Sequence, residues 1–412
     1  MKLKLQNIGI IQDADINIDG ITLIAGQNDT GKSTVGKILY AVVKGFNQSE
    51  SQFQQQQNKI ISSYYQDILK EIKKNWKENI TEFQTKEISN EWIDSISELI
   101  SKDFVPDEIR NQIINQLFFL RAYLSIQFNS IEQKGEELKL WINSEISVLS
   151  NIFNTEKNHS KIEIEDLLGN AIIENHFKFS QSEYFLTNLD NNLETYYKEA
   201  YYIESPLVVD DSLKNFIGNN SYSIYLRSRQ EELAKSLSNP LPNITLDYSK
   251  IYSEITEIIN GEITINLLNG VQYKKNDKEI NIKNTAVGIK SFGLIQLLLK
   301  NNRLNNRTLL IIDEPEVHLH PTWQVKYAEI LVRLSKEFEI PIVLTSHSPY
   351  FIEALESYSK KYKYEKSTNF YFAEKNEDGL SSKITDVTNN ISPILSSISE
   401  AFYIIQDIND EG

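Results

Sequence analysis

Apolar and polar residues alternate along the first part of the chain as they do in short strands. Lys2–Gln6 and Asp15–Ile18 alternate with a period of two, which predicts two half-buried antiparallel strands. The turn signal Asp19-Gly20 precedes Ile21–Ala25, a short apolar run that predicts a buried strand. Apolar residues then recur at helical spacing over Ser33–Val43. The predicted order is therefore strand, strand, strand, loop, helix.

The pattern changes between about Phe46 and Thr195. Apolar residues here recur every three or four positions, which is the spacing of amphipathic helices. The clearest examples are Ile60, Tyr64, Ile68 and Ile72, and then Ile113, Leu117, Leu120, Tyr123 and Leu124. The segment Pro106-Asp107-Glu108 has the proline and the acids that are typical of a helix start. We therefore predict a helical insertion of roughly 150 residues, which is the size of a domain.

Strands and helices alternate after this insertion, which predicts an α/β sheet. A turn at Asn269-Gly270 predicts a hairpin that joins Ile263–Leu267 to Val271–Tyr273. The other predicted strands are Ala200–Ile203, Thr308–Ile312, Ile342–Thr345 and, as the last, Phe370–Ala373, and the predicted helices are Ser221–Ser238, Val287–Leu299, Pro321–Glu337 and Pro349–Glu356. The domain boundaries that follow are 1–46 for the first lobe of the core, 47–198 for the insertion and 199–412 for the rest of the core.

Composition limits the classes of protein that remain. The chain has 412 residues, no cysteine and a formal net charge of −15. The lack of cysteine excludes disulfides and thiolate metal sites. Met1–Asn7 is a poor signal peptide, and no apolar run approaches the roughly 18 residues that span a bilayer. We therefore expect a cytoplasmic protein with no membrane contact.

The charge also bears on nucleic acid as a partner. A net negative charge argues against sequence-independent binding to a phosphate backbone, although a local basic groove stays open as an alternative. Lys360–Tyr364 interleaves basic and aromatic residues, and we expect a solvated loop there. We expect Arg227 and Arg229 to lie on a surface face of a helix. The sequence thus leaves nucleic-acid binding open but does not indicate it.

The strongest chemical signal is a glycine-rich loop between the predicted buried strand and helix. Residues 26–33, Gly-Gln-Asn-Asp-Thr-Gly-Lys-Ser, fit the phosphate-binding pattern Gly-x4-Gly-Lys-Ser/Thr. Such a loop directs several N–H groups into one concavity, and the helix that follows favours phosphate at its N-terminus. We expect Lys32 to reach the β- and γ-phosphates of ATP and Ser33 to bind Mg²⁺. The predicted ATP-binding residues are Gly26, Asn28, Asp29, Thr30, Gly31, Lys32, Ser33 and Thr34.

Two carboxylates follow a second buried strand. Leu309–Ile312 is continuously apolar, and Asp313 and Glu314 come directly after it. Ligand sites of α/β sheets lie at the carboxyl ends of the strands. We expect Asp313 to hold Mg²⁺, directly or through water, and Glu314 to be the general base that orients and deprotonates the attacking water.

A third buried strand, Ile342–Thr345, delivers His347 to the same edge of the sheet. The chain has five histidines, and three of them, His318, His320 and His347, fall in this part of the sequence. An imidazole at this place can donate to the γ-phosphate and respond to its loss. We therefore predict that Lys32, Glu314 and His347 form the catalytic set.

These motifs, in this order, resemble the ABC-type ATPases with SMC-like heads, and in detail the OLD-like branch of that class. The resemblance rests on Asn7-Ile8-Gly9, Gly26–Thr34, Asp313–Pro321 with Gln324, and Thr345–Pro349, and it covers about residues 1–46 and 200–400. It implies a mixed sheet with flanking helices. It also implies that a homodimer, or a higher homo-oligomer, holds Mg-ATP between two heads.

In such dimers a signature loop of one head closes on the γ-phosphate of the other. The matching segment here is Thr285–Ser291, in which Gly288 and the following helix N-terminus suit a phosphate contact. Val287 replaces the usual serine before that glycine, and the hydroxyl of Thr285 or Ser291 is an alternative. This departure argues against fast turnover.

The family's Q-loop and D-loop also have counterparts here. The strand Tyr201–Ile203 is placed like the one that leads to the Q-loop, but no glutamine ends it, so Glu204 or Ser205 would have to take that role. Glu316–His320 corresponds to the D-loop, which crosses the dimer interface. We favour a packing and hydrogen-bonding role for His318 and His320.

OLD-like nucleases carry a C-terminal Toprim nuclease domain. We expect none here because few residues separate Thr345–Pro349, the segment that contains His347, from Gly412. The chain in this respect resembles the ATPase subunits of two-component bacterial anti-phage defence systems. This resemblance implies a regulatory ATPase that controls a separate effector, a nuclease or a toxin. One alternative is a scaffold that holds ATP with negligible turnover, and another is a DNA-repair ATPase of the SMC type.

Overall fold

The computed structural model describes residues 1–75, 88–102, 106–125, 142, 160–165, 171–178, 183–189, 197–210, 229–238, 240–241, 246–266, 270–276, 278–399 and 408. These residues form two compact units. The first, which we call the core unit, consists of Met1–Asn47 and Glu137–Gly412, and the second, the helical unit, is Gln48–Glu136.

One large mixed sheet organises the core unit. Its strand order is β6-β5-β4-β1-β2-β14-β13-β3-β12-β11-β7. The strands are β1 (Lys2–Ile8), β2 (Ile11–Asn17), β3 (Ile21–Gly26), β4 (Ser160–Glu165), β5 (Ala171–Lys178), β6 (Glu183–Leu189), β7 (Glu199–Ile203), β11 (Thr308–Ile312), β12 (Ile342–Ser346), β13 (Thr368–Lys375) and β14 (Ser382–Asp386).

The sheet has a parallel half and an antiparallel half. Strands β13, β3, β12, β11 and β7 run parallel, and every residue of β3, β11 and β12 is buried. Continuous burial explains the unbroken apolar runs in these strands, since helices cover both faces. Strands β1 and β2 pair antiparallel, as their alternating pattern predicts. The mixed α/β sheet of the prediction is therefore confirmed.

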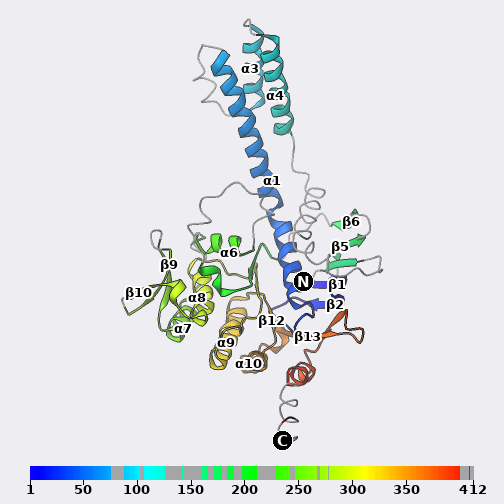
Figure 1. Cartoon of the computed structure of the whole chain (residues 1–412), viewed down its shortest axis with the longest axis vertical. Coiled ribbons are helices and arrows are strands. Elements are labelled where there is room, and N and C mark those ends of the chain that lie inside the picture. Colours follow the sequence, from blue (N-terminus) through cyan, green and yellow to red (C-terminus); the bar gives the residue numbers. More distant parts are fainter. Residues whose placement is uncertain are drawn as a thin grey trace. The chain divides into compact units, whose positions relative to one another are not determined.

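Helices cover both faces of this sheet (Figure 1). On one face, α1 (Lys32–Asn75) packs its first turns through Val35, Ile38 and Leu39. The other face is covered by α7 (Ser249–Ile259), α8 (Val287–Lys300), α9 (Pro321–Phe338) and α10 (Pro349–Lys361), with α6 (Arg229–Ser238) beside β7. The result is a three-layer arrangement in which the carboxyl ends of the parallel strands stay accessible.

A small second sheet stands beside α8. It consists of β8 (Glu262–Asn266), β9 (Gly270–Lys275) and β10 (Lys278–Asn281), and its register pairs Ile263 with Tyr273. The predicted hairpin is confirmed for the described residues, which exclude Leu267 and Asn269. The described residues also include 3₁₀ turns at Pro206–Val209, Ile282–Asn284 and Glu365–Ser367, and residues 392–399 are helical.

The helical unit is built from the later part of α1 together with α3 (Asn90–Lys102) and α4 (Asp107–Ser125). Its core contains the apolar positions that recur at helical spacing in the sequence. The fully or nearly fully buried members are Ile61, Ile68, Leu69, Ile72, Trp92, Ile93, Ile96, Ile100, Ile113, Leu117 and Leu120. The helical pattern is therefore confirmed for this part of the insertion.

Other parts of the prediction are wrong. Residues 160–165, 171–178 and 183–189, which we predicted to be helical, are the strands β4, β5 and β6. They extend the main sheet from β1. In apolar runs this short, the spacing of residues does not distinguish a helix from a strand, and pairing with β1 decides for the strand. The helical unit is consequently shorter than the predicted insertion 47–198.

Smaller differences lie at element ends. The helix that we ended at Val43 continues to Asn75, and the last strand is β14 rather than β13. Lys360 and Lys361 form the last turn of α10 and do not belong to a loop. None of the helices among the described residues is both long enough and apolar enough to cross a membrane.

Candidate active site

Strand register brings the predicted chemical groups to one edge of the sheet. Ile312 of β11 pairs with Leu344 of β12 and with Ile203 of β7. The residues after these positions therefore emerge side by side, and they include Asp313 and Thr345. Since β12 also pairs with β3, the loop after Gly26 lies at the same edge.

The glycine-rich loop has the backbone that phosphate binding requires. Gly26 has φ 150° and Gly31 has φ 86°. A Cβ atom on Gly26 would lie 2.1 Å from the carbonyl oxygen of Ala373, and one on Gly31 would lie 2.5 Å from Ile11 Cγ1. Both positions thus combine a left-handed conformation with close packing, and only glycine satisfies the two requirements.

The other predicted loop residues have distinct environments. Thr30 donates its hydroxyl hydrogen to the carbonyl oxygen of Gln27 at 2.8 Å, which tightens the loop. Asn28 and Asp29 are exposed, and Asp29 (φ 57°) forms an ion pair of 3.3 Å with Lys375. Thr34 is buried in the first turn of α1. The loop therefore offers backbone groups and exposed side chains at the start of a helix.

Lys32 lies at the centre of the loop. Its ammonium group donates to the carbonyl oxygens of Gly26 at 2.9 Å and Gln27 at 2.6 Å. Burial lowers the pKa of Lys32, and the nearby carboxylates, Glu314 first, oppose this shift. The hydrogen bonds of this mostly buried cation go to neutral carbonyl oxygens, which a charged phosphate oxygen can replace.

Asp313 accepts hydrogen bonds through both of its carboxylate oxygens. Its Oδ1 accepts a hydrogen bond from Ser33 Oγ at 3.0 Å and another from the hydroxyl of Thr345. Its Oδ2 accepts a hydrogen bond from the hydroxyl of Tyr202 at 3.1 Å. The two residues that we predicted to hold Mg²⁺ from distant parts of the sequence, Ser33 and Asp313, are therefore in direct contact.

Tyr202 and Thr345 were missed as site residues. Burial raises the pKa of Tyr202 well above its usual value, and the charge of Asp313 adds to this, so the phenol stays protonated and acts as a donor. Arg229 lies over the Tyr202 ring, with 4.9 Å between the guanidinium carbon and the ring centroid. The available sequence signal was the strand end itself: Tyr202 is the penultimate residue of β7.

Glu204 and Ser205 each have a partner near the end of β7, and their role in a Q-loop stays a prediction. Glu204 forms an ion pair of 3.4 Å with Arg229. Ser205 caps the 3₁₀ turn at Pro206–Val209 by accepting a hydrogen bond from the N–H of Leu207. The residue of β7 that reaches Asp313 is Tyr202, two positions before Glu204. Arg227 lies outside the described residues.

Glu314 and His347 lie next to each other at the mouth of the site. Their Oε1 and Nδ1 atoms are 3.3 Å apart, and both side chains are partly exposed. Glu314 has φ 47°, an uncommon conformation for a residue with a side chain, and its N–H donates to the Thr345 hydroxyl at 3.0 Å. A carboxylate held in a strained turn beside an imidazole is suited to proton transfer at a bound water.

The signature-like segment begins α8. Ala286 is the N-cap residue, and no side chain caps the helix, consistent with the missing serine hydroxyl at Val287. A Cβ atom on Gly288 would lie 3.0 Å from Trp323 Cε3 and 3.1 Å from Leu319 Cδ2. Gly288 thus permits close packing of α8 on α9, and a contact to a partner's nucleotide stays a prediction.

The other two histidines of this region do not approach Glu314 in the way that His347 does. His320 is the N-cap of α9 and accepts a hydrogen bond from the N–H of Thr322, which confirms a hydrogen-bonding role. His318 is exposed with φ 66°. Both belong to the turn between β11 and α9.

The donor set fits magnesium better than a metal that prefers nitrogen or sulfur ligands. Ser33 and Asp313 supply neighbouring oxygen atoms. Among the described residues, no group of three or more His, Cys, Asp or Glu side chains is arranged to hold a metal by itself. Mg²⁺ commonly takes one or two protein oxygens and completes its shell with substrate phosphates and water. The residues present therefore fit Mg²⁺ held together with a nucleotide.

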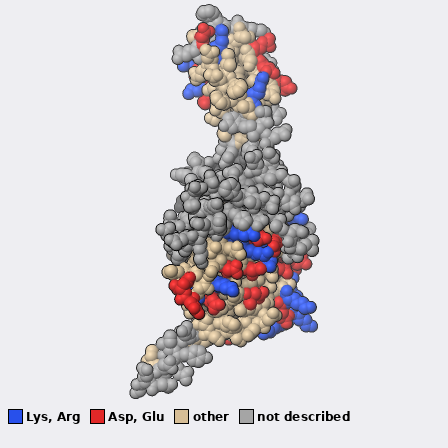
Figure 2. All heavy atoms as spheres, turned by 90° about the vertical axis from the view of Figure 1, so that its right-hand side faces the viewer, with Lys and Arg blue, Asp and Glu red and all other residues tan. Residues whose placement is uncertain are grey.

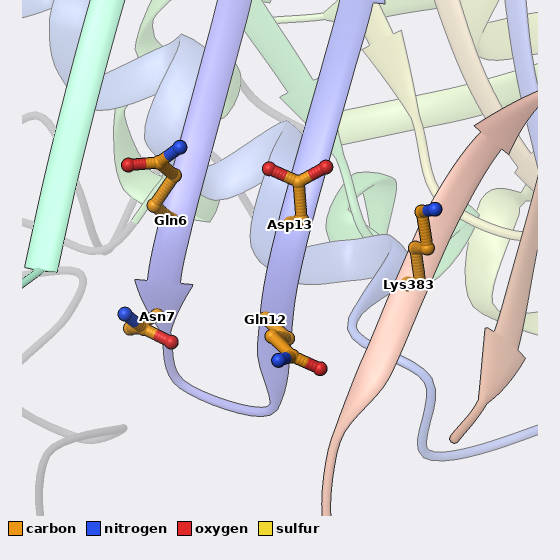
Figure 3. A pocket seen from close by; sticks show the side chains of 5 residues that line it. All are labelled: Gln6, Asn7, Gln12, Asp13 and Lys383. Atoms are coloured by element: carbon orange, nitrogen blue, oxygen red, sulfur yellow. The ribbon is translucent and has the colours of Figure 1, made fainter. Parts of the chain in front are cut away.

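The molecule also has polar hollows outside this edge. One, of about 510 Å³, is lined by Gln6, Asn7, Gln12, Asp13 and Lys383 from β1, β2 and β14 (Figure 3). Figure 2 shows acidic and basic side chains mixed over the described part of one face. Opposite charges lie close together in both places, unlike the clustered cations that a phosphate backbone requires.

Comparison with known proteins is consistent with this site. A model of the family described as "AAA ATPase domain" matches residues 1–352. A curated relative, the retron Vc95 probable ATPase of Vibrio cholerae serotype O1 biovar El Tor, is 26% identical over 204 residues. These residues are 47% of this chain and 35% of that protein, so the match spans about a third of the relative's length.

Solved structures of SMC heads are also similar. The SMC head domain from Thermotoga maritima has a TM-score of 0.42 at 11% identity, with 94% of this chain and 98% of that chain covered. An SmcHead bound to the C-winged helix domain of ScpA has a TM-score of 0.44 at 10% identity, with coverage of 93% and 96%. Since the family model covers most of the 412 residues, this chain belongs to the AAA ATPase domain family.

Proposed function

We propose that the protein binds ATP with Mg²⁺ and hydrolyses it at the site formed by the glycine-rich loop and the carboxyl ends of β11 and β12. The observation that carries this proposal is the hydrogen bond of 3.0 Å between Ser33 and Asp313. It joins the two predicted magnesium ligands, which are 280 positions apart in sequence. Lys32 and Glu314 belong to the same cluster of charges.

The roles of the residues follow from their chemistry. Ser33 and Asp313 would hold Mg²⁺, which when bound neutralises phosphate charge. Lys32 would exchange its two carbonyl acceptors for phosphate oxygens, which are stronger acceptors because they are charged. Glu314 would orient and deprotonate the attacking water, and His347, beside it, would donate to the γ-phosphate.

We further propose that two copies assemble around ATP and that the assembly controls a separate effector in anti-phage defence. The start of α8 supports the first part, because the exposed Ala286 leaves backbone N–H groups at a helix N-terminus uncapped by a side chain. The similarity to a probable ATPase of a retron supports the second part. We place the protein in the cytoplasm, with a nuclease or a toxin as the effector.

Solution mass, measured with and without Mg-ATP on the wild type and Glu314→Gln, tests both parts when phosphate release is recorded alongside. We expect ATP-dependent assembly and slow phosphate release, with the release abolished and the assembly prolonged in Glu314→Gln. The exposed Glu353→Gln on α10 is the matched control and should behave as the wild type. Phosphate release that Glu314→Gln leaves unchanged would contradict the role of Glu314.

The second candidate function is an ATP-loaded scaffold with negligible turnover. Val287 favours it, because the uncapped start of α8 lacks a hydroxyl for the γ-phosphate of a partner. Under this hypothesis a fixed assembly retains ATP and releases no phosphate until the effector or its trigger arrives. Val287→Ser separates the two functions. In a slow ATPase it should raise the rate of phosphate release. In a scaffold it should leave phosphate release undetectable.

A further inference from the structure

A buried carboxylate that the proposed chemistry does not use lies behind the active site. We propose that Glu316 is a positioning residue, which fixes the segment Ser346–Ser348 and the ring of His347 and thereby sets the rate of hydrolysis. This inference rests on the ATPase function proposed above. It concerns a residue two positions after Glu314 that contacts neither the magnesium ligands nor the glycine-rich loop through the hydrogen bonds described here.

One oxygen atom of Glu316 organises the whole segment after β12. Its Oε1 accepts hydrogen bonds from Ser346 Oγ at 2.7 Å, from the N–H of His347 at 2.9 Å and from the N–H of Ser348 at 3.2 Å. Three donors from three consecutive residues converge on a single carboxylate oxygen. Hydrogen bonds to a charged acceptor are stronger than those between neutral groups, so this oxygen determines the local backbone path.

The same oxygen also faces the imidazole. His347 Nδ1 lies 3.6 Å from Glu316 Oε1 and 3.3 Å from Glu314 Oε1. The ring is thus oriented with Nδ1 toward two carboxylates. Because the hydrogen-bonding directions of the two ring nitrogens diverge widely, this orientation points Nε2 away from the carboxylates, as a contact to phosphate requires.

Burial indicates that Glu316 has a function beyond packing. Only 3% of its side chain is exposed, whereas 35% of the Glu314 side chain is exposed. Its second oxygen, Oε2, is buried with no hydrogen-bond partner, and burial raises the pKa of the group. An incompletely satisfied buried carboxylate destabilises a fold, so its place here is explained by what Oε1 holds.

The turn between β11 and α9 directs Glu316 inward. Glu314 (φ 47°) and His318 (φ 66°) are both left-handed, and the carbonyl oxygen of Glu314 accepts from the N–H of Val317 at 3.0 Å. Gln324 of α9 supports the same segment, because its Oε1 accepts from Ser348 Oγ at 2.6 Å. The turn after the catalytic carboxylate and the segment with His347 therefore behave as one unit.

Amide hydrogen exchange without nucleotide tests the positioning role directly. In Glu316→Ala we expect the amide of His347 to exchange about tenfold faster or more, because its acceptor is lost, whereas the N–H of Ser348 keeps Ser346 Oγ as an acceptor at 3.1 Å. Glu316→Gln keeps an oxygen acceptor at the Oε1 position and should retain most of the protection. The exposed Glu353→Ala on α10 is the control. Unchanged exchange in Glu316→Ala, with the fold intact, would overturn the proposal.

A double-mutant cycle with His347 tests whether Glu316 acts through the ring. We expect Glu316→Ala to lower kcat by about 10²-fold with little change in KM, since a misplaced group costs rate rather than binding. In a His347→Ala background, Glu316→Ala should cost much less. Full additivity, or a parallel loss of ATP affinity, would overturn the proposal. A wild type that releases no phosphate would overturn the ATPase function instead, and amide exchange would then decide the positioning role alone.

Discussion

The active-site edge of the core unit and the interior of the helical unit are specified in different ways. At the edge, the arrangement depends on individual hydrogen bonds. Asp313 accepts hydrogen bonds from Ser33, Thr345 and Tyr202, which come from three different elements. In the helical unit, eleven buried apolar residues pack together, and Trp92 is the largest of them. The first region depends on residue identity, and the second depends on spacing and volume.

This difference predicts how substitutions divide. A polar change at the edge removes a specific contact to substrate and should alter binding or rate with little effect on stability. An apolar truncation in the helical unit leaves a cavity and should alter stability without touching the nucleotide. Four substitutions test this division, and their expected effects decrease from Glu314 to Tyr202.

Glu314→Gln should have the largest effect. Loss of a general base typically costs about 10²–10⁴-fold in rate, and the amide preserves the shape of the side chain. We therefore expect kcat for phosphate release to fall by this factor while ATP binding persists. Single-turnover measurements separate the chemical step from product release. A fall in ATP affinity of the same size would place Glu314 in binding rather than in catalysis.

Lys32→Ala should come next. The ammonium group can make two or more charge-assisted hydrogen bonds to phosphate, at about 1.5–3 kcal/mol each, so ATP affinity should fall at least about hundredfold. Titration calorimetry measures this change, and Lys37→Ala on the same helix is the matched control. Melting of the protein without nucleotide should change little, since the acceptors of Lys32 are loop carbonyls. A large loss of stability in Lys32→Ala would contradict the expectation that polar substitutions at the sheet edge leave stability nearly unchanged.

Trp92→Ala should act on stability alone. Removal of this ring, which is 2% exposed and packs on Tyr65 with 5.1 Å between ring centroids, should lower the free energy of unfolding of the helical unit by about 3–5 kcal/mol. Amide exchange over α3 and α4 reports this loss, with exposed Glu91→Ala as the control. ATP affinity should stay within about twofold of the wild type. A marked loss of ATP binding would show that the two units are energetically coupled.

Tyr202→Phe should have the smallest effect. It removes one donor to Asp313, which keeps Ser33 and Thr345, so we expect a loss of about 1 kcal/mol, or about fivefold in rate at limiting Mg²⁺. Tyr201→Phe is the matched control, because Tyr201 packs with the opposite face of the sheet. If the two variants lowered the rate equally, the proposed contribution of the Tyr202 hydroxyl to the site would be contradicted.

Much of the site could be predicted because its residues stand in contiguous motifs. The loop Gly26–Ser33 has a fixed backbone requirement, and Asp313 and Glu314 directly follow an apolar strand. In each case a local pattern contains both the structural reason and the chemical group. The buried parallel strands β3, β11 and β12 were predictable for the same reason, since burial on both faces produces an unbroken apolar run.

The residues that we missed depend on contacts between distant segments. Tyr202 reads as an ordinary strand residue until the register of β7 and β11 places it beside Asp313. The resemblance assigned Glu316 to the D-loop, and only the structure shows its side chain buried beside His347. The strands β4–β6 are equally non-local, because their place in the main sheet depends on pairing with β1.

Local patterns in the sequence were enough to identify the glycine-rich loop Gly26–Ser33, the acidic pair Asp313 and Glu314, His347 as a candidate, the alternation of strands and helices, and the apolar stripes of the helical unit. Each is a local pattern whose period or residue types suffice to identify it. The tertiary structure alone fixes which side chains meet at the sheet edge, and it leaves Glu314 partly exposed while Glu316 is buried beside His347. These outcomes depend on strand register and on left-handed turns at Glu314 and His318, which no local pattern specifies.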